Sequence, residues 1–311
     1  SESGFITTGL GAALSLGTTG FAVPNDTIKE TGERRIIDGI EFEFQMTPGT
    51  EAPAEFVFFL PQFSALCMSE ITSHHLHNIY TPRGAQVRDA LAWSAQINES
   101  IDRYGEKLDV QFASHHWPIW GQSEALDYLE KQRDLYKYIH DQTIRLMNQG
   151  LYPDQIVEQI QLPDSIANSP YLYEFYGTVR WSVKSIFNGY LGWFGGNPSK
   201  LDPLTINEKA IRMSYLAGGN DKLLSELRNA VKNDDMQWAL ELSDHLIALD
   251  YLIEEVKDLR VEALIYEGSR SSNPNKRNYF LTSAFELNNG CLLYTSPSPR
   301  DRTRSRMPSS A

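Results

Sequence analysis

The sequence has little cysteine and no long apolar run, and both absences limit what the protein can be. Its 311 residues include two cysteines, Cys67 and Cys291, which form no C-x-x-C pair, so thiolate zinc sites and redox motifs of that spacing are excluded. No run of about 18 apolar residues occurs, so no membrane span is predicted. The formal net charge of −12 argues against nucleic acid as a partner, because phosphate contacts need clustered Lys and Arg.

Several common catalytic motifs are also missing. The chain contains no G-x-S-x-G, no H-E-x-x-H and no H-x-H-x-D-H, which excludes an elbow-type serine hydrolase and a zincin. The segment Gly9-Leu-Gly11 lacks the third glycine of a dinucleotide-binding loop, and no clear strand precedes it. We therefore expect a surface or site-lining loop there.

The two ends of the sequence give different signals. Ser1-Glu-Ser-Gly does not resemble a signal peptide, because no basic start precedes an apolar core. Residues 291–311 hold four Arg and one Asp among many Ser and Pro, without hydrophobic periodicity, and we expect them to be disordered. They resemble translated adapter read-through more than protein. The alternative is a basic tail that binds anions or membranes. No fold is predicted for these residues.

Short apolar runs predict strands in the first third of the chain. Asp38-Gly39 separates Ile36-Ile37 from the alternating run Ile40–Met46, which is the pattern of a β-hairpin. The continuous apolar runs 56–60 and 65–68 predict strands buried on both faces.

A helix and a further strand complete this part. Apolar side chains recur at three- and four-residue spacing from Val87 to Tyr104, and Gly105 follows, which predicts a helix. Residues 108–113 predict another strand. Strand, helix and strand in this order indicate a layered α/β domain over residues 1–120.

Helical periodicity dominates from Gly121 onward, and an all-helical domain is predicted over residues 121–290. The expected helices span residues 123–148, 171–187, 205–217, 222–232, 236–249, 254–266 and 275–287. Residues 230–263 look like one tetratricopeptide-type helix pair, but one such unit cannot stack alone.

Acids and imidazoles follow the predicted strands of the α/β part. Glu51 lies after the turn Pro48-Gly49, and Glu70 ends a buried apolar run, where an ionised acid is costly unless it is paired or bound to metal. His115 and His116 end a strand, and at most one of them should face a common site, because neighbouring strand residues point to opposite faces. Glu55 competes with Glu51, since either acid could equally be an exposed loop residue.

Three further residues are candidates for binding an anion or donating a proton. Arg83 lies near the start of the predicted helix, where a planar guanidinium is well placed to hold sulfate or phosphate, although an ordinary surface ion pair is equally consistent. His77 or Asn78 could donate to a leaving oxygen, or simply fix their loop. Carboxylates and imidazoles together suit zinc.

Three stretches of the chain resemble the alkyl sulfatases built on a metallo-β-lactamase domain, the class that hydrolyses dodecyl sulfate. They are Thr50–Glu55, the run from Met68 through His77-Asn78-Ile-Tyr-Thr-Pro-Arg83 to Asp89, and Tyr190–Pro198. The resemblance implies the C-terminal part of a metallo-β-lactamase αββα sandwich, followed by an all-α dimerisation domain.

The resemblance also implies a binuclear site with two zinc ions per intact subunit. Glu51 would hold one zinc, Glu70 would bridge and His115 would hold the other. His77 and Arg83 would act in catalysis. Arg83, Asn78 and Tyr190 would bind an alkyl sulfate substrate. The implied partner is a second copy of the chain, and the implied location is the bacterial periplasm or the exterior.

The sequence departs from that family in two respects. The H-x-H-x-D-H motif, which supplies the other four ligands, is absent, and residues 291–311 stand where an alkyl-binding domain is expected. We therefore expect an internal fragment that is inactive or nearly so alone. Two alternatives remain: another metallo-β-lactamase-fold hydrolase, such as a phosphoesterase or lactonase, and a helical-repeat interaction protein. Arg83 and the aromatic loop near Trp193 favour an anionic ester with an apolar tail.

Overall fold

The structure is a computed structural model that describes residues 18, 20–82 and 84–290. Arg83, the predicted loop around Gly9 and the predicted tail 291–311 lie outside the described residues. The described residues up to Pro203 form one compact unit, here the sheet unit, and those from Leu204 form a second, the helical unit.

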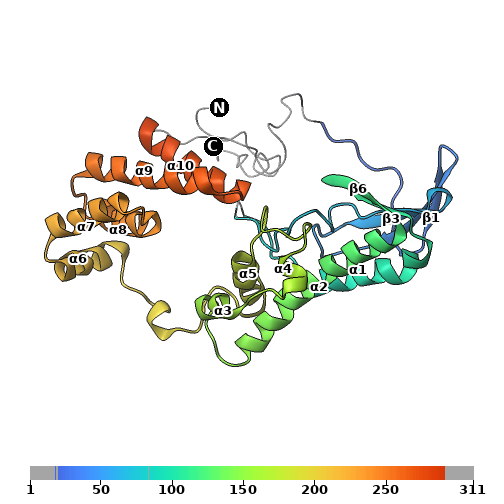
Figure 1. The fold of residues 1–311 in the computed structure, drawn as a ribbon, viewed down its shortest axis with the longest axis horizontal. Helices are drawn as coiled ribbons and strands as arrows, with labels where there is room; N and C mark the ends of the chain where they lie inside the picture. Colours follow the sequence, from blue (N-terminus) through green and yellow to red (C-terminus); the bar gives the residue numbers. More distant parts are fainter. Residues whose placement is uncertain (1–17, 19, 83, 291–311) are drawn as a thin grey trace, which may run out of the picture. The chain divides into compact units, whose positions relative to one another are not determined.

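A six-stranded mixed sheet forms one layer of the sheet unit (Figure 1). Its strands lie in the order β1 (Arg34–Ile37), β2 (Ile40–Met46), β3 (Phe56–Leu60), β4 (Ala65–Cys67), β5 (Val110–Ala113) and β6 (His116–Trp120). Only the β4–β5 pair is parallel, and the other neighbours are antiparallel. Five of these strands match the predictions, whereas β6 was not predicted.

The strand details follow from local chemistry. The β1–β2 hairpin turns at Asp38 and Gly39, both with positive φ (49° and 80°), as the turn dipeptide predicted. The prediction that β3 is buried on both faces is wrong. Val57 and Phe59 are buried while Phe56 is 37% exposed, because β3 lies in an antiparallel part of the sheet that packs a core on one face.

Five helices belong to the sheet unit: α1 (Ala90–Tyr104), α2 (Gln122–Met147), α3 (Pro153–Gln159), α4 (Asp164–Ala167) and α5 (Val179–Leu191). Helix α1 connects the parallel strands β4 and β5, and the Asp89 side chain caps its start by accepting from the Leu91 and Ala92 N–H groups, both at 2.9 Å. The predicted helix over 171–187 is wrong for its first part. Helix α5 begins after Thr178, whose hydroxyl accepts from the Trp181 N–H at 3.0 Å.

One apolar core joins the sheet to α1, α2 and α5. Trp93 of α1 and Tyr136 of α2, both fully buried, stack with ring centroids 4.7 Å apart. The Trp93 indole N–H donates to the Ile71 carbonyl oxygen at 2.7 Å. The loop that follows β4 is therefore anchored to the helix layer.

The helical unit has its own core. It contains α6 (Ile206–Ala217), α7 (Asn220–Lys232), α8 (Met236–Ala248), α9 (Ile253–Arg270) and α10 (Pro274–Asn289). Leu227, Ala239 and Leu246 are completely buried within it, and each predicted helix is confirmed to within a few residues. No helix among the described residues is long and apolar enough to cross a membrane.

The predicted order, an α/β part followed by a helical region, is confirmed. However, the position where strands give way to helices differs from the position where the two compact units divide. Strands end at Trp120 and α2 begins at Gln122, close to the boundary predicted near residue 120. The compact units divide after Pro203, because α2 and α5 bury their apolar faces in the same core as the sheet.

Candidate metal centre

Three strands that run in one direction deliver the candidate side chains to one edge of the sheet. Strands β2 and β4 are both antiparallel to β3, and β5 is parallel to β4, so β2, β4 and β5 all end on the same side. Glu51, Glu70 and His115 lie in the segments that follow these three strands. Side chains at the carboxyl ends of like-directed strands can converge, as ligand sites in open sheets do.

Backbone hydrogen bonds extend the β4–β5 pairing past the ends of the strands. The Met68 N–H donates to the Phe112 carbonyl oxygen at 2.8 Å, and the Ser114 N–H donates to the Ser69 carbonyl oxygen at 2.9 Å. Ser69 has φ 49°, which turns the chain immediately before Glu70. The two segments are thus held together where they carry Glu70 and His115.

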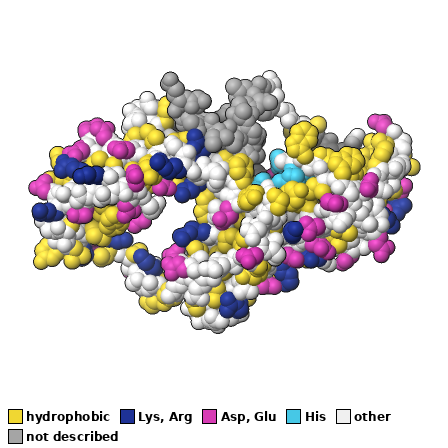
Figure 2. Space-filling view, viewed as in Figure 1, with side chains coloured by type: hydrophobic (Ala, Val, Ile, Leu, Met, Phe, Trp, Pro, Cys, Tyr) yellow, Lys and Arg dark blue, Asp and Glu magenta, His cyan; other side chains and the backbone are white. Residues whose placement is uncertain are grey.

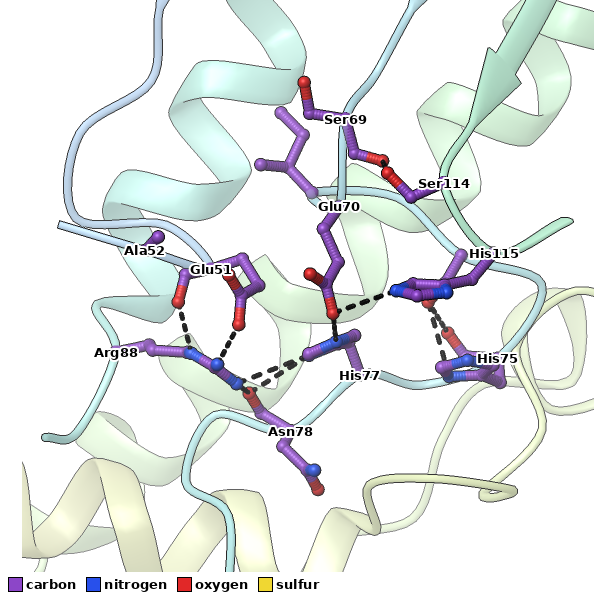
Figure 3. Close-up of polar contacts among 12 residues, drawn as sticks. Glu51, Ala52, Ser69, Glu70, His75, His77, Asn78, Arg88, Ser114 and His115 are labelled. Atoms are coloured by element: carbon purple, nitrogen blue, oxygen red, sulfur yellow. Dashed lines mark hydrogen bonds and ion pairs between the residues drawn. The ribbon is translucent and has the colours of Figure 1, made fainter. Parts of the chain in front are cut away.

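The Glu70 carboxylate lies at the middle of the cluster (Figure 3). Its Oε1 atom is 3.3 Å from His77 Nε2 and 3.3 Å from His115 Nε2. One ligand atom each from Glu51, Glu70 and His77 lies within 4.8 Å of the others. The structure therefore groups both predicted acids with His77, the predicted proton donor, while His115, the predicted ligand, contacts Glu70 and is not part of that group.

His77 is the most buried member of the cluster, with 3% of its side chain exposed. Its neighbours Leu76 and Ile79 are buried in the core. The Leu76 backbone pairs with the segment before α5, accepting from the Gly177 N–H at 2.8 Å. A Cβ at Gly177 would lie 2.5 Å from the His77 carbonyl oxygen, so a glycine is required for this close approach.

Glu55, the competing acid, lies beside the cluster, and its carboxylate is not among the grouped ligand atoms. Its carboxylate accepts from the Glu70 N–H at 3.0 Å, the Thr50 hydroxyl at 3.2 Å and the Ala52 N–H at 3.3 Å. Burial raises the pKa of Glu55 to about 6, and the charge of Glu51 adds to this effect.

A hydrogen-bond donor and a guanidinium act in the opposite direction on Glu70. Although burial opposes it, the hydrogen bond from His77 and the nearby charge of Arg88 lower the pKa of the Glu70 carboxyl. Glu70 is therefore ionised at neutral pH.

The two adjacent histidines diverge, as the strand alternation predicted. His115 contacts Glu70, whereas the His116 ring stacks on His74 with centroids 4.0 Å apart. Burial lowers the pKa of His116, and burial lowers that of His74 to about 4. Figure 2 shows histidine side chains reaching the surface beside hydrophobic ones.

The remaining predicted residues are not joined to the cluster by their side chains. Asn78 is 1% exposed, and its amide atoms have no hydrogen-bond partner among the described residues; Figure 3 shows the amide directed away from Glu70. Tyr190 is 55% exposed, and its hydroxyl contacts His140 Nε2 at 2.8 Å. Arg83 lies outside the described residues, so its predicted role stays a prediction.

Arg88 is the residue that sequence reasoning missed. It precedes α1, and its guanidinium forms an ion pair with the Glu51 carboxylate. Its Nε donates to the Glu51 carbonyl oxygen and its Nη1 to the Asn78 carbonyl oxygen, both at 2.7 Å. The available signal was an arginine within the same recognisable run as Arg83, five residues further on.

The donor set fits a divalent metal ion. Carboxylate oxygen and imidazole nitrogen are suitable ligands for zinc and related ions. Glu51 and Glu70 lie close together and partly buried, and two carboxylates in such a setting repel unless a cation is near. Arg88 supplies one positive charge on the Glu51 side, which leaves the Glu70 side, with its two imidazoles, suited to a metal ion.

Residues 152–290 match the family model of alkyl sulfatase dimerisation. The chain is 39% identical over 289 residues to a linear primary-alkylsulfatase from Pseudomonas sp., which covers 93% of this chain and 43% of that protein. It is 37% identical over 290 residues to the alkyl/aryl-sulfatase BDS1 from Saccharomyces cerevisiae, covering 93% of this chain and 45% of that protein.

Solved structures give the same result. A double mutant of the sec-alkyl sulfatase PisA1 superposes with a TM-score of 0.87 at 35% identity, over 93% of this chain and 46% of that one. The stereoselective inverting sec-alkylsulfatase Pisa1 from Pseudomonas sp. gives a TM-score of 0.82 at 36% identity, over 88% and 43%. The chain spans about half the length of the curated relatives it matches.

Proposed function

Given that this chain is a relative of the alkyl sulfatases, we propose that it is part of a zinc-dependent hydrolase that converts alkyl sulfate esters to alcohol and sulfate. The observation that carries the proposal is the Glu70 carboxylate behind the like-directed strands β2, β4 and β5: it lies 3.3 Å from His115 Nε2, and it offers a ligand atom within 4.8 Å of one from Glu51. The same chain is 35–40% identical to alkylsulfatases over at least 90% of its length.

In this proposal Glu51, Glu70 and His115 hold zinc, with two ions per subunit of the complete enzyme. Zinc, when bound, would act as a Lewis acid and supply an activated water near neutral pH. His77 donates a proton from Nε2 to the leaving oxygen. Arg83 and Asn78 bind the sulfate group; the Asn78 amide, which has no hydrogen-bond partner among the described residues, is directed away from Glu70 and would have to turn toward the cluster for this role.

Aromatic side chains near the cluster support an ester with an apolar tail. Trp117, two residues after His115, is 85% exposed. Phe175, whose ring centroid lies 6.1 Å from that of His75, is 43% exposed. Exposed apolar surface beside a polar cluster is typical of a binding site for an amphipathic ligand.

The helical unit would join two copies of the chain. The match of residues 152–290 to a dimerisation family supports a homodimer, and α6 offers apolar side chains for it. Ile211 is 52% and Tyr215 84% exposed, and they lie four residues apart, on one side of the helix. Aromatic and aliphatic side chains exposed in this way are the usual anchors of protein interfaces.

The catalytic test compares this chain with a longer protein in which an H-x-H-x-D-H segment precedes it. We expect two zinc ions per longer chain by mass spectrometry of metal content, and sulfate release from dodecyl sulfate. The chain alone should take up less zinc and release little or no sulfate. Hydrolysis of dodecyl phosphate without hydrolysis of dodecyl sulfate would instead favour a phosphoesterase, and an active but metal-free protein would contradict the proposal.

A further inference from the structure

One guanidinium connects the two loops that carry the candidate site. Arg88 donates from Nε to the Glu51 carbonyl oxygen and from Nη1 to the Asn78 carbonyl oxygen, each at 2.7 Å, and its Nη2 pairs with the Glu51 carboxylate. Its side chain is 15% exposed. Figure 3 shows this fork between the segment that carries Glu51 and the segment that carries His77.

The same guanidinium faces the His77 ring. Arg88 Nη1 lies 3.5 Å from His77 Nδ1. Arginine has only donors, so this contact is favourable when Nδ1 is the acceptor and repulsive when Nδ1 carries a proton. The arginine therefore favours the tautomer of neutral His77 whose proton is on Nε2.

The other side of the ring favours the same tautomer. His77 Nε2 is 3.3 Å from Glu70 Oε1, and an ionised carboxylate only accepts hydrogen bonds. The backbone oxygen of Asn78, 3.4 Å from Nδ1, would favour the opposite tautomer, but it already accepts from Arg88 at 2.7 Å. Two contacts of the ring thus agree on an Nε2–H donor.

The tautomer of His77 determines which imidazole of the cluster donates a proton and which can bind a metal ion. A ring nitrogen that carries a proton has no lone pair for a metal ion, so His77 Nε2, 3.3 Å from Glu70 Oε1, is a donor and not a metal ligand. His115, whose Nε2 is also 3.3 Å from Glu70 Oε1, has no such arginine contact among the residues that the structure describes and remains the imidazole that can bind metal.

We propose that Arg88 is a positioning residue that fixes His77 as an Nε2–H donor and holds the Glu51 carboxylate toward the metal centre. The second half of this role rests on the proposed function. Lysine could not reproduce it, because a point charge lacks the planar fork that reaches two carbonyl oxygens and a carboxylate together. Outer contacts of this kind orient metal-binding carboxylates and fix histidine tautomers.

The first experiment reads the tautomer directly. In metal-free chain labelled with ¹⁵N-histidine, near neutral pH, long-range ¹⁵N–¹H correlation spectra should show His77 as the Nε2–H form. Arg88→Met should shift His77 toward the Nδ1–H form, donating to the Asn78 carbonyl oxygen. Arg103→Met is the matched control, because Arg103 forms an exposed i,i+4 pair with Glu99 on α1, and it should leave the His77 signals unchanged.

The second experiment measures zinc affinity of the same proteins by competition with a chromophoric chelator. We expect Arg88→Met to weaken binding about 10- to 100-fold, Arg88→Lys to weaken it less, and Arg103→Met to have no effect. If Arg88→Met fails to fold, Arg88→Lys carries the test, with a mixed His77 tautomer and weakened zinc binding expected.

The outcomes separate the inference from the proposed function. A longer protein with the H-x-H-x-D-H segment that takes up no zinc would contradict the proposed function, while the tautomer spectra of this chain would still decide whether Arg88 positions His77. Unchanged His77 signals together with unchanged zinc affinity in a folded Arg88 variant would show that Arg88 is only a structural ion pair, and would overturn the inference.

Discussion

The sheet unit and the helical unit bury polar side chains in different places and for different purposes. In the sheet unit, Glu55, His77 and Asn78 are buried at the one edge where three strands end. In the helical unit, Asn273 caps the start of α10, accepting from the Lys276 N–H at 3.0 Å, and Arg277 donates to the Gly268 carbonyl oxygen at 2.8 Å. The sheet unit thus buries polar groups at a candidate site as well as within its core, as at Gln132, whereas the two named in the helical unit serve a helix start and a backbone contact.

This difference indicates which unit buries polar groups for function at the expense of its stability. Polar and charged groups removed from water are unfavourable unless they are paired, and the sheet unit keeps two close carboxylates and an unpartnered amide at its edge. The helical unit contains no comparable cluster among residues 204–290. Changes in the first unit should therefore affect metal binding, and changes in the second should affect stability or association alone.

Among the substitutions that test this comparison, Glu70→Ala should have the largest effect on zinc binding. Because the Glu70 carboxylate contacts both imidazoles, its removal should weaken zinc binding by more than about 100-fold, beyond the effect of losing an outer contact. Chelator competition measures the change. Glu99→Ala, which removes an exposed acid of α1, is the control and should bind zinc normally. Normal zinc occupancy in Glu70→Ala would remove Glu70 from the site.

Core substitutions test whether the units are stabilised separately. Leu129 and Leu227 are both completely buried, one in each core, and replacing either by Ala should cost about 3 kcal/mol of unfolding free energy. Calorimetry should show two transitions, with each substitution lowering the transition of its own unit. A single transition lowered equally by both would mean that the two cores unfold as one.

The association prediction concerns the helical unit alone. Placing charges on α6 with Ile211→Glu and Tyr215→Glu should weaken dimerisation about 10- to 100-fold, because exposed apolar anchors lose their contacts and gain a desolvation cost. Light scattering over a concentration series measures this, with Ile265→Glu on α9 (44% exposed) as the control. Unchanged dimerisation of the double variant would place the interface elsewhere. An altered zinc affinity would contradict the expectation that changes in the helical unit do not affect metal binding.

The smallest effect is expected at high pH in the sheet unit. Burial raises the pKa of Tyr104 to about 12 from 10.0, so the unfolded chain loses this proton first. The contribution of Tyr104 to stability is complete below pH 10 and declines as pH rises toward 12, by about 1 kcal/mol at pH 11.

The Tyr104→Phe variant isolates that effect. The Tyr104 hydroxyl has no hydrogen-bond partner among the described residues, so the variant should be as stable as wild type at pH 7 and more stable at pH 11 in urea unfolding. Tyr138→Phe is the control at pH 7, since the Tyr138 hydroxyl donates to the Gln161 carbonyl oxygen at 2.8 Å and its loss should cost about 1 kcal/mol there. An equal pH dependence in wild type and Tyr104→Phe would contradict the prediction.

Periodicity predicted most of the elements, because apolar spacing and turn dipeptides act locally. The hairpin at Asp38-Gly39 and the helices of residues 204–290 are examples. Strand β6 was missed because Trp117 and Trp120, its large apolar residues, are 85% and 69% exposed and give no buried pattern. The start of α5 was missed because residues 171–178 are aromatic but non-helical, with Tyr173 and Gly177 pairing their backbones with Leu76.

The candidate site was predictable in part. Acids and imidazoles that follow strands could be recognised from sequence, and so could the resemblance to alkyl sulfatases. The role of Arg88 could not, because its contacts to Glu51 and His77 span 37 and 11 residues and depend on how two loops fold together. Which imidazole binds metal depends on the same contacts.

The most direct test of the central claim is anomalous diffraction at the zinc edge from crystals of this chain grown with zinc. The account predicts an anomalous peak in contact with the carboxylates of Glu51 or Glu70 and the His115 ring, with the Arg88 guanidinium still on the far side of Glu51. A zinc peak bound elsewhere, with Glu51 and Glu70 making no contact with it, would contradict the metal centre and the hydrolase built on it.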